Sequence, residues 1–311
     1  MVAYAAARAR KVIVLDALTY AGDKANLEGI SGDWTLVEGD INNRPLVLKL
    51  LREHRVTSVI HLAAESHVDN SITGPECFID TNIKGTFLLL EACREYWNGG
   101  AEGFRFLYVS TDEVYGALGI SGKFSEASPT RPNSPYAASK AAGDHLVRAW
   151  HHTYGLPIII THCSNNYGPR QHPEKFIPTM IRSALAGEAL PVYGDGKHVR
   201  DWLHVEDHCA GLWLALEKGI TGETYDFGGN CEIENIALVK MICAQLGEKY
   251  ARQIAFVTDR PGHDRRYAID FSKAKSELGF SPRQTFEQGL KETVQWYVAH
   301  QDWDAMMRGK R

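Results

Sequence analysis

Long apolar runs, paired cysteines and blocks of like charge are all missing from this 311-residue sequence. No stretch approaches the ~18 consecutive apolar residues of a membrane-spanning helix, and the mean hydropathy is −0.28. The six cysteines are dispersed, with no CxxC pair and no zinc-ligand spacing. These absences exclude a membrane span and a disulfide scaffold, so we expect a soluble, cytoplasmic protein with reduced thiols and no metal site.

An excess of either charge is also missing, because 34 Lys and Arg residues face 38 Asp and Glu residues and leave a net charge of −4. No Lys/Arg block is present that could follow a nucleic-acid backbone. We therefore expect no nucleic-acid partner, and any phosphate that the protein binds should belong to a small molecule. The remaining composition, 44% hydrophobic, is that of a globular protein with one large core or two linked cores.

Short aliphatic segments alternate with helical patterns in the first half of the chain. Strands are expected at residues 11–16, 57–64, 104–110 and 156–161, and helices at 81–96 and 136–154. This alternation predicts an α/β fold with a doubly wound, Rossmann-like parallel sheet. From about Asn165 the composition changes, because Gly, Pro and Asn become frequent, and short strands such as 190–193 and 254–257 interleave with helices. We therefore expect a first domain over 1–164 and a smaller substrate lobe, mainly over 165–311, with some segments returning to the first domain.

Asp16 ends the first expected strand. A dinucleotide-binding sheet places at this position the acid that hydrogen-bonds an adenosine ribose. Asp40 and Ile41 follow another short apolar run, residues 34–37, and would lie near the adenine ring in the same architecture. Many strands end in Asp, so a purely structural role for these residues stays open.

Tyr136 and Lys140 form a YxxxK pattern within an expected helix. Residues four apart share one helical face, so the phenol and the ammonium group can converge. The cation is expected to lower the pKa of the phenol, which could then take a proton from a substrate alcohol while hydride leaves its carbon. Thr111, at the end of an upstream strand, could orient the same alcohol. The pattern also occurs by chance, so it gains weight only from its neighbours.

Asp112 and Glu113 directly follow Thr111. Adjacent residues of a strand point to opposite faces, so both carboxylates can reach one site only if the chain has left the strand there. Two carboxyl groups whose environments separate their pKa values can serve as one acid and one base. The alternative is a solvated acidic pair at a strand end.

These residues lie in longer segments that occur together, namely His61–Asp69, Ser110–Gly116, Tyr136–Lys140, Cys163–Pro169, Arg200–Asp207 and Asp259–Asp270. With them the chain resembles, from about residue 11 to 300, the dTDP-glucose 4,6-dehydratases, a nucleotide-sugar dehydratase family among the extended short-chain dehydrogenase/reductases. The Thr-Asp-Glu triplet and the Arg-Pro-Gly-His-Asp-Arg-Arg-Tyr run are more specific to this family than YxxxK.

The resemblance implies NAD as cofactor and a lyase reaction in deoxysugar biosynthesis. Tyr136, assisted by Lys140 and Thr111, would remove the 4-hydroxyl proton of the glucose while hydride passes from C4 to NAD. Glu113 would then remove the C5 proton, and Asp112, held protonated, would protonate the departing C6 hydroxyl. Hydride would return to C6, giving dTDP-4-keto-6-deoxyglucose and water.

The resemblance also implies two sets of binding residues. NAD would be held by Asp16, Ala17, Leu18, Thr19, Asp40, Ile41, Leu62, Ala63, Ala64, Thr81, Tyr136, Lys140 and Asn166. The nucleotide sugar would be held by Ser66, Thr111, Asn165, Lys175, Phe176, Ile177, Pro178, Pro191, Val192, Tyr193, Arg200, Asn235, Asp259, Arg260, Pro261, Gly262 and His263. Arginine forks suit diphosphate oxygens, and Tyr193 suits a base face. Four histidines are expected to be structural or solvated, namely His151, His152, His162 and His172.

Family members are typically homodimers, so the resemblance also implies a homodimer that pairs the helices at 81–96 and 136–154.

One departure from the family pattern concerns the start of the sequence. The family carries a strand and a GxxGxxG loop before the position of Asp16, where glycines let the backbone approach a pyrophosphate. We therefore expect the chain to begin inside the first helix, with residues 2–9 as its remnant, and to bind NAD poorly as written. Its end at Arg311 also falls slightly short of the family's last segment.

Two alternatives remain open from the sequence. A nucleotide-sugar epimerase of the same fold would need Tyr136 and Lys140 but not the Asp112 and Glu113 pair. A non-catalytic chain that has lost NAD binding would agree with the missing loop, but not with five intact catalytic residues.

Overall fold

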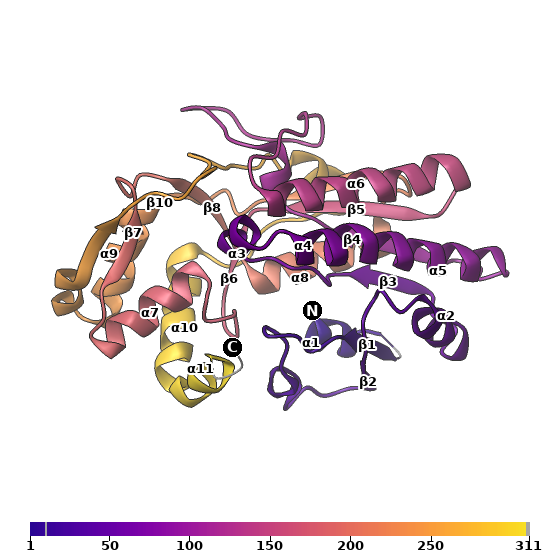
Figure 1. The fold of residues 1–311 in the computed structure, drawn as a ribbon, viewed down its shortest axis with the longest axis horizontal. Coiled ribbons are helices and arrows are strands. Elements are labelled where there is room, and N and C mark those ends of the chain that lie inside the picture. Colours follow the sequence, from indigo (N-terminus) through magenta and orange to yellow (C-terminus); the bar gives the residue numbers. More distant parts are fainter. Residues whose placement is uncertain (10, 309–311) are drawn as a thin grey trace.

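The parallel sheet expected from the first half of the chain is present in the computed structural model, which describes residues 1–9 and 11–308. Four parallel strands follow the order β3 (Ser58–His61), β4 (Arg105–Val109), β5 (Ile158–Cys163) and β9 (Thr224–Phe227). Two further strands, β1 (Val12–Asp16) and β2 (Trp34–Glu38), form a separate parallel pair (Figure 1). The α/β class with parallel strands is therefore confirmed, although the sheet consists of two hydrogen-bonded pieces.

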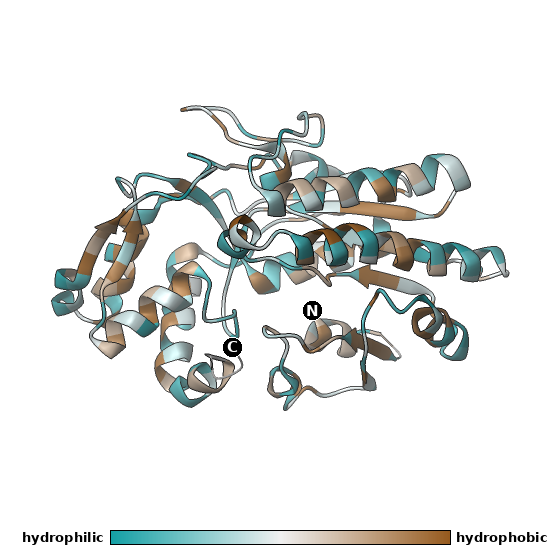
Figure 2. Ribbon diagram, in the orientation of Figure 1, coloured by the Kyte–Doolittle hydropathy of each residue, from teal (hydrophilic) through white to brown (hydrophobic). Residues whose placement is uncertain are grey.

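Helices cover both faces of the four-stranded sheet. Helices α5 (Thr86–Asn98) and α6 (Pro135–Tyr154) pack over one face, where Phe106 and Tyr108 of β4 join their core. Helix α8 (Val205–Lys218) covers the opposite face, where Leu107 points. Consecutive residues of β4 thus enter opposite cores, as a strand buried on both sides requires. Figure 2 shows the resulting pattern, with hydrophobic strands inside and polar residues along the helices.

The second half of the chain builds a core of its own. Helices α7 (Phe176–Ala186), α9 (Asn235–Leu246) and α10 (Phe286–Ala299) pack around the parallel strands β7 (Leu190–Tyr193) and β11 (Ile254–Val257). A three-stranded sheet joins this region to the first, in the order β10 (Glu232–Glu234), β8 (Val199–His204) and β6 (Asn165–Tyr167). Strand β6 follows directly after β5, and strand β8 leads directly into α8. This region therefore lies at the carboxyl ends of β4 and β5 (Figure 1).

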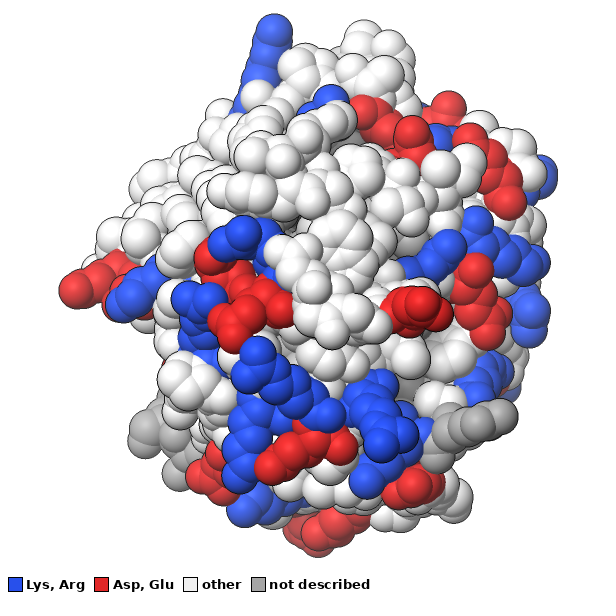
Figure 3. Space-filling view, turned by 90° about the vertical axis from the view of Figure 1, so that its right-hand side faces the viewer, with Lys and Arg blue, Asp and Glu red and all other residues white. Residues whose placement is uncertain are grey.

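The remaining elements are short or peripheral. They are α1 (Val2–Ala6), η1 (Lys24–Leu27), α2 (Arg44–Glu53), α3 (Val68–Thr73), α4 (Glu76–Phe78), η2 (Ile79–Gly85), η3 (Asp112–Tyr115), η4 (Glu248–Gln253), η5 (Ala274–Leu278) and α11 (Gln301–Arg308). In the described part of the chain, no helix has both the length and the apolarity needed to cross a membrane. On the face drawn in Figure 3, basic and acidic side chains are interspersed.

The expected elements recur, most of them with shifted ends. The strands at 190–193 and 254–257 have the predicted bounds, and the helix at 136–154 begins one residue earlier, at Pro135. The segment 57–64 leaves its strand after His61, because Leu62 to Ser66 form a loop. The helix expected over 81–96 starts as the π-type segment η2 and becomes regular only at Thr86.

Candidate functional site

The Thr111 to Glu113 segment forms a tight turn at the carboxyl end of β4. Strand β4 ends at Val109, and Thr111 caps the 3-10 segment η3 by accepting a hydrogen bond from the Glu113 amide at 3.3 Å. The chain has therefore left the strand where the two acids stand, which is the condition for both carboxylates to reach one site. This edge of a parallel sheet is where ligands bind in doubly wound folds.

Helix α6 carries Tyr136 in its first turn. Ser134 caps the helix by accepting a hydrogen bond from the Ala137 amide at 3.1 Å, and Pro135 occupies the first turn, where its missing N–H costs nothing. One turn later, Lys140 Nζ donates to the Val109 carbonyl at 2.8 Å and lies 4.2 Å from the centre of the Tyr108 ring. Lys140 is thereby fixed between α6 and β4, beside the Thr111 turn.

Burial dominates the pKa values of this pair. It lowers the pKa of Lys140 to about 8. It also raises the pKa of Tyr136 well above its ordinary value; the charge of Glu113 adds to this, and a hydrogen bond with Thr111 opposes it. The pKa of Tyr136 is therefore raised in this structure, whereas a lowering by Lys140 was expected from the sequence.

The two acids differ in electrostatic environment although they are neighbours in sequence. Burial and then the charge of Glu113 raise the pKa of Asp112 well above its ordinary value. Burial also raises the pKa of Glu113, but Arg260, Arg200 and Lys175 oppose that rise in this order. Asp112 is therefore suited to hold a proton. Glu113 faces three cations and is suited to lose its proton and act as a base.

The three cations that face Glu113 come from the second half of the chain. Arg200 on β8 is buried and donates to the Asp264 carbonyl at 2.9 Å. Arg260 lies 3.1 Å from an oxygen of Asp69 on α3, and Lys175 Nζ donates to the Ser66 carbonyl at 2.7 Å. The structure thus brings predicted substrate residues of both halves to the turn of Thr111 to Glu113.

Tyr193, Asp259 and His263 form a second group near Arg260. The Tyr193 hydroxyl donates to Asp69 Oδ2 at 3.3 Å, and His263 Nδ1 is 2.6 Å from Asp259 Oδ1. His198, Asp259 and His263 could together hold a metal ion, and they are the one such trio among the described residues. Burial and the neighbouring charges of Arg260 and Arg200 lower the pKa of His263 to about 3. These cations favour an anion over a metal ion, as a diphosphate site requires.

Other predicted substrate residues reach the site differently. The side chains of Ile177 and Val192 are fully buried in the core, so they can meet a ligand only through their backbone. Asn235 is buried at the start of α9, and Phe176 stacks on Trp202. Pro178 is buried and Pro191 partly buried, whereas Pro261 and Gly262 are exposed in the loop that carries Arg260.

The predicted NAD residues follow the carboxyl ends of β1, β2 and β3. Asp16 accepts a hydrogen bond from the Leu18 amide at 2.8 Å, which shapes the turn of Ala17 to Thr19, and Leu18 has a φ of 48°. Asp40 accepts from the Asn42 amide at 2.7 Å beside buried Ile41. Leu62 and Ala63 are exposed and Ala64 partly buried in the loop after β3, with Thr81 in η2. Asn166 on β6 accepts a hydrogen bond from His208 at 2.9 Å.

These residues fit the two ends of a dinucleotide. A Cβ on Gly22 would lie 2.8 Å from Leu18 Cα and 3.1 Å from Asp16 Oδ1, so the small residue keeps the turn at Asp16 compact. At the other end, the buried Ser110 Oγ and Asn165 Oδ1 lack hydrogen-bond partners within the described residues. Such unpaired buried atoms are suited to a polar ligand. A glycine-rich turn between a strand and a helix is not found in the described ranges, so they offer no such cradle for the pyrophosphate.

Several polar residues at the site were not singled out by the sequence. Asp69 pairs with Arg260 and Tyr193, and Asp264 accepts a 2.6 Å hydrogen bond from the buried Tyr267 hydroxyl. Both lie inside segments that carried the family resemblance, which was the available signal. The partners of Asp69 are far away in sequence, so spacing could not reveal them, whereas Asp264 and Tyr267 are only three residues apart.

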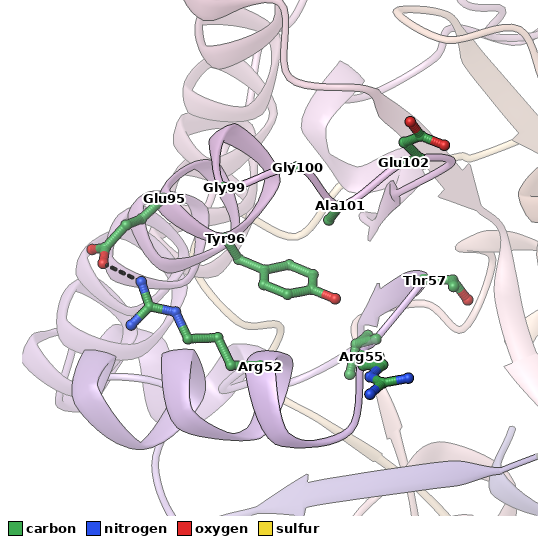
Figure 4. A pocket seen from close by; sticks show the side chains of 10 residues that line it. Arg52, Arg55, Thr57, Glu95, Tyr96, Gly99, Gly100, Ala101 and Glu102 are labelled. Carbon is green, nitrogen blue, oxygen red and sulfur yellow. Dashed lines mark hydrogen bonds and ion pairs between the residues drawn. The ribbon is translucent and has the colours of Figure 1, made fainter.

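The pocket drawn in Figure 4 lies elsewhere on the molecule. It has a volume of 390 Å³ and is lined by Arg52, Arg55, Tyr96 and the loop 99–102. Thr57 and Ala101 in its wall precede β3 and β4, so it opens at the amino ends of the strands. It is separate from the catalytic turn, which follows the carboxyl ends.

Comparison with known proteins decides the family. A family model described as GDP-mannose 4,6 dehydratase matches residues 2–293. A dTDP-glucose 4,6-dehydratase of Xanthomonas campestris is 58% identical over 96% of this chain and 89% of its own length. The chain belongs to the dTDP-glucose 4,6-dehydratase family. A second member, dTDP-glucose 4,6-dehydratase 1 of Escherichia coli, is 49% identical over 94% of this chain and 87% of its own length.

Solved structures of the family agree with this assignment. The dTDP-glucose 4,6-dehydratase DesIV of Streptomyces venezuelae, solved with NAD and dTDP, has a TM-score of 0.92 and 46% identity, covering 98% of this chain and 92% of that one. A UDP-glucose 4-epimerase of Thermotoga maritima shares the fold with a TM-score of 0.86, but only 29% identity, covering 96% and 94%. The epimerase alternative is therefore not favoured over membership in the dehydratase family.

Proposed function

We propose that this chain is an NAD-dependent lyase that converts dTDP-glucose to dTDP-4-keto-6-deoxyglucose and water. One observation carries the proposal: the turn after β4 sets Thr111, Asp112 and Glu113 beside Tyr136 and Lys140, with Asp112 buried and Glu113 partly buried. An alcohol base alone suits a dehydrogenase or an epimerase. Elimination of water across C5 and C6 additionally needs one acid and one base, and this site contains both.

Tyr136 is the proposed base for the sugar 4-hydroxyl. Its phenolate oxygen takes the alcohol proton as C4 becomes a ketone, and Lys140 stabilises the negative charge that this oxygen carries before it is protonated. Thr111, which has a hydrogen bond with Tyr136, orients the same hydroxyl. When bound, NAD would supply the reversible hydride acceptor that no side chain of this chain provides.

Glu113 and Asp112 are the proposed pair for the loss of water. The C4 ketone acidifies the C5 hydrogen, and Glu113 removes it as a proton. The C6–O bond then breaks, and Asp112 transfers its proton to the departing hydroxyl, which leaves as water. Glu113 later returns a proton to C5, so its charge is restored. The different electrostatic surroundings of the two acids support these roles, since more cations oppose the rise in pKa at Glu113 than at Asp112.

The cationic residues of the second half are proposed to bind the nucleotide diphosphate. Arg200 and Arg260 can each present a planar fork to phosphate oxygens, and Lys175 adds a point charge. Tyr193 is proposed to cover the base. The residues proposed to hold the sugar nucleotide are Ser66, Thr111, Asn165, Lys175, Phe176, Ile177, Pro178, Pro191, Val192, Tyr193, Arg200, Asn235 and Asp259 to His263.

The proposed NAD residues are those at the ends of β1 to β3. Asp16 would accept hydrogen bonds from the adenosine ribose, and Asp40 with Ile41 would lie at the adenine. The remainder are Ala17, Leu18, Thr19, Leu62, Ala63, Ala64, Thr81, Tyr136, Lys140 and Asn166. The division at residue 164 into an NAD-binding domain and a sugar-nucleotide lobe belongs to the same proposal.

We further propose a homodimer located in the cytoplasm. Phe87 on α5 is 39% exposed and stacks edge-on against Trp150 of α6, so these two helices present an aromatic surface to a second copy. The six cysteines are free thiols, which supports a reducing compartment.

Product analysis tests the proposed function. Purified protein incubated with NAD and dTDP-glucose should yield a nucleotide sugar that has lost the mass of one water and carries a C4 ketone, as read by mass spectrometry and NMR. A product of unchanged mass with an inverted C4 would instead indicate an epimerase, and would contradict the proposal.

A further inference from the structure

A row of buried ionisable side chains leads from Lys140 into the protein interior. Asp144 follows Lys140 by one turn of α6, and its Oδ2 lies 3.2 Å from Nε2 of His162 on β5. Nδ1 of His162 lies 2.9 Å from Oδ1 of Asp226 on β9. The Tyr115 hydroxyl donates to the same Asp226 oxygen at 3.0 Å. None of these four side chains has a role in the proposed reaction, yet all are buried.

The charges alternate along this row. Burial lowers the pKa of His162, but Asp144 and Asp226 raise it to about 10, so at neutral pH the ring is an imidazolium that donates from both nitrogens. Lys140 is the cation on the other side of Asp144. The order is thus Lys140 positive, Asp144 negative, His162 positive and Asp226 negative, which lets four charges share a buried region without a net excess.

Asp144 lies one helical turn after Lys140 on α6. The remaining groups around Lys140 are the Val109 carbonyl, the Tyr108 ring, the Cys163 thiol of β5 and His61 of β3. Burial and Lys140 lower the pKa of His61 to about 3, so this ring is neutral. Among the described residues, Asp144 is the carboxylate whose charge raises the pKa of Lys140 against its burial.

We propose that Asp144 is a positioning residue for the dehydration: its carboxylate, held in place by His162, keeps Lys140 protonated beside Tyr136. The inference rests on the proposed function, because it needs Tyr136 as the alcohol base. Spacing supports it too, since Tyr136, Lys140 and Asp144 follow one another at intervals of four on α6 and share one helical face. The protonation state of Lys140 can be measured without turnover, so the two claims are separable.

The direct test is an NMR titration of protein labelled with ¹³C at lysine Cε, with the Lys140 signal assigned by its loss in Lys140→Met. In the wild type, Lys140 should titrate near pH 8, well below the exposed lysines. Asp144→Asn should lower this midpoint by about 1 pH unit, because an adjacent opposite charge is lost. His162→Gln should raise it, because Asp144 then lacks its second cation and its full charge acts on Lys140.

The pH profile of kcat/KM supplies the second readout. Its alkaline limb should shift in the same direction as the Lys140 midpoint in each variant. Asp144→Glu, which keeps the charge, should restore a limb close to that of the wild type. A general loss of folding would lower activity in both variants without moving the limb in opposite directions. If Asp144→Asn does not fold, His162→Gln and Asp144→Glu still carry the test.

Two results would overturn the inference. One is a Lys140 midpoint that is the same in Asp144→Asn and wild type; the other is a shift of equal sign in Asp144→Asn and His162→Gln. If the wild type does not dehydrate dTDP-glucose while the midpoints shift as expected, the proposed function fails and the link between Asp144 and Lys140 stands. Normal turnover with unshifted midpoints would refute the link alone.

Discussion

At the scale of single residues, the site depends on two neighbouring acids that experience different surroundings. Asp112 has Glu113 and Asp201 beside it with one opposing arginine, whereas Glu113 faces Arg260, Arg200 and Lys175. A turn of 3-10 helix is what permits this, because it lets consecutive side chains enter one site from different directions. The assignment of acid and base follows from the second half of the chain, which supplies the cations.

Replacement of each acid should therefore block a different step. Asp112→Asn should lower the formation of the deoxysugar by about 10²–10⁴-fold but still permit exchange of the C5 hydrogen with solvent, since Glu113 remains. Glu113→Gln should lower both to a similar degree. Deuterium exchange followed by NMR separates the two variants, and C5 exchange that survives in Glu113→Gln would contradict the assignment.

Tyr136 is the second test at this scale. Tyr136→Phe removes the phenolic oxygen that, as a phenolate, accepts the substrate proton, so the rate of transient NADH formation should fall by about 10²–10⁴-fold. Absorbance at the NADH band measures it. Tyr154→Phe at the exposed end of the same helix is the matched control and should keep wild-type activity. Equal rates in the two variants would show that Tyr136 is not the base.

At the scale of elements, the sequence predicted helix α6 to within one residue. The shared face of Tyr136 and Lys140 followed from their spacing of four residues, and the structure shows that the helix is bounded by a cap at Ser134 and by Gly155. The ends of the strands in the first half of the chain were predicted less well, because the point at which the chain leaves β3, after His61, is set by tertiary packing. The π-type start of η2 has no local signature. The pairing of Asp69 with Arg260 joins residues far apart in sequence, so spacing could not predict it.

Close packing of α6 on β4 gives a stability prediction. A Cβ at Gly143 would lie 2.0 Å from the Tyr108 hydroxyl, so the helix can approach the sheet only with glycine there. Gly143→Ala should destabilise the fold by about 1–3 kcal/mol through overpacking. Gly119→Ala, in a loop with open space around its Cβ, is the matched control. Urea denaturation compares the two, and equal stability would contradict this packing.

The row behind Lys140 gives a pH prediction for stability. The pKa of His162 rises on folding from 6.5 to about 10, so its contribution is fully present below pH 6.5 and is lost as pH rises towards 10. The stability difference between wild type and His162→Gln should therefore shrink over this window. Melting temperatures of both proteins across the window measure it. A difference that is constant or grows with pH would show that His162 is not charged in the folded state.

At the scale of the whole molecule, two cores meet at one edge of the sheet. The first supplies the catalytic turn and α6, and the second supplies Arg200 and Arg260. The alternation of strand and helix patterns predicted the parallel sheet, and the change of composition near Asn165 predicted a second region. How the two regions lie against each other is set by side-chain packing and by the three-stranded sheet, which periodicity does not encode.

The proposed dimer is testable at this scale. Phe87→Glu places a charge on the aromatic surface of α5 and α6 and should yield a monomer, as measured by light scattering during size-exclusion chromatography. Phe256→Glu is the control, since Phe256 is 60% exposed on β11 in the other region and should leave the dimer intact. A wild-type monomer, or a Phe87→Glu dimer, would contradict the proposed surface.

The most direct test of the dehydration mechanism is turnover of dTDP-glucose in heavy water. The account predicts a 4-keto-6-deoxy product with deuterium at C5, because Glu113 removes the C5 hydrogen as a proton and returns one that has exchanged with solvent. The label should disappear together with the product in Glu113→Gln. A wild-type product that carries no deuterium at C5 would contradict proton removal by Glu113 and with it the central claim.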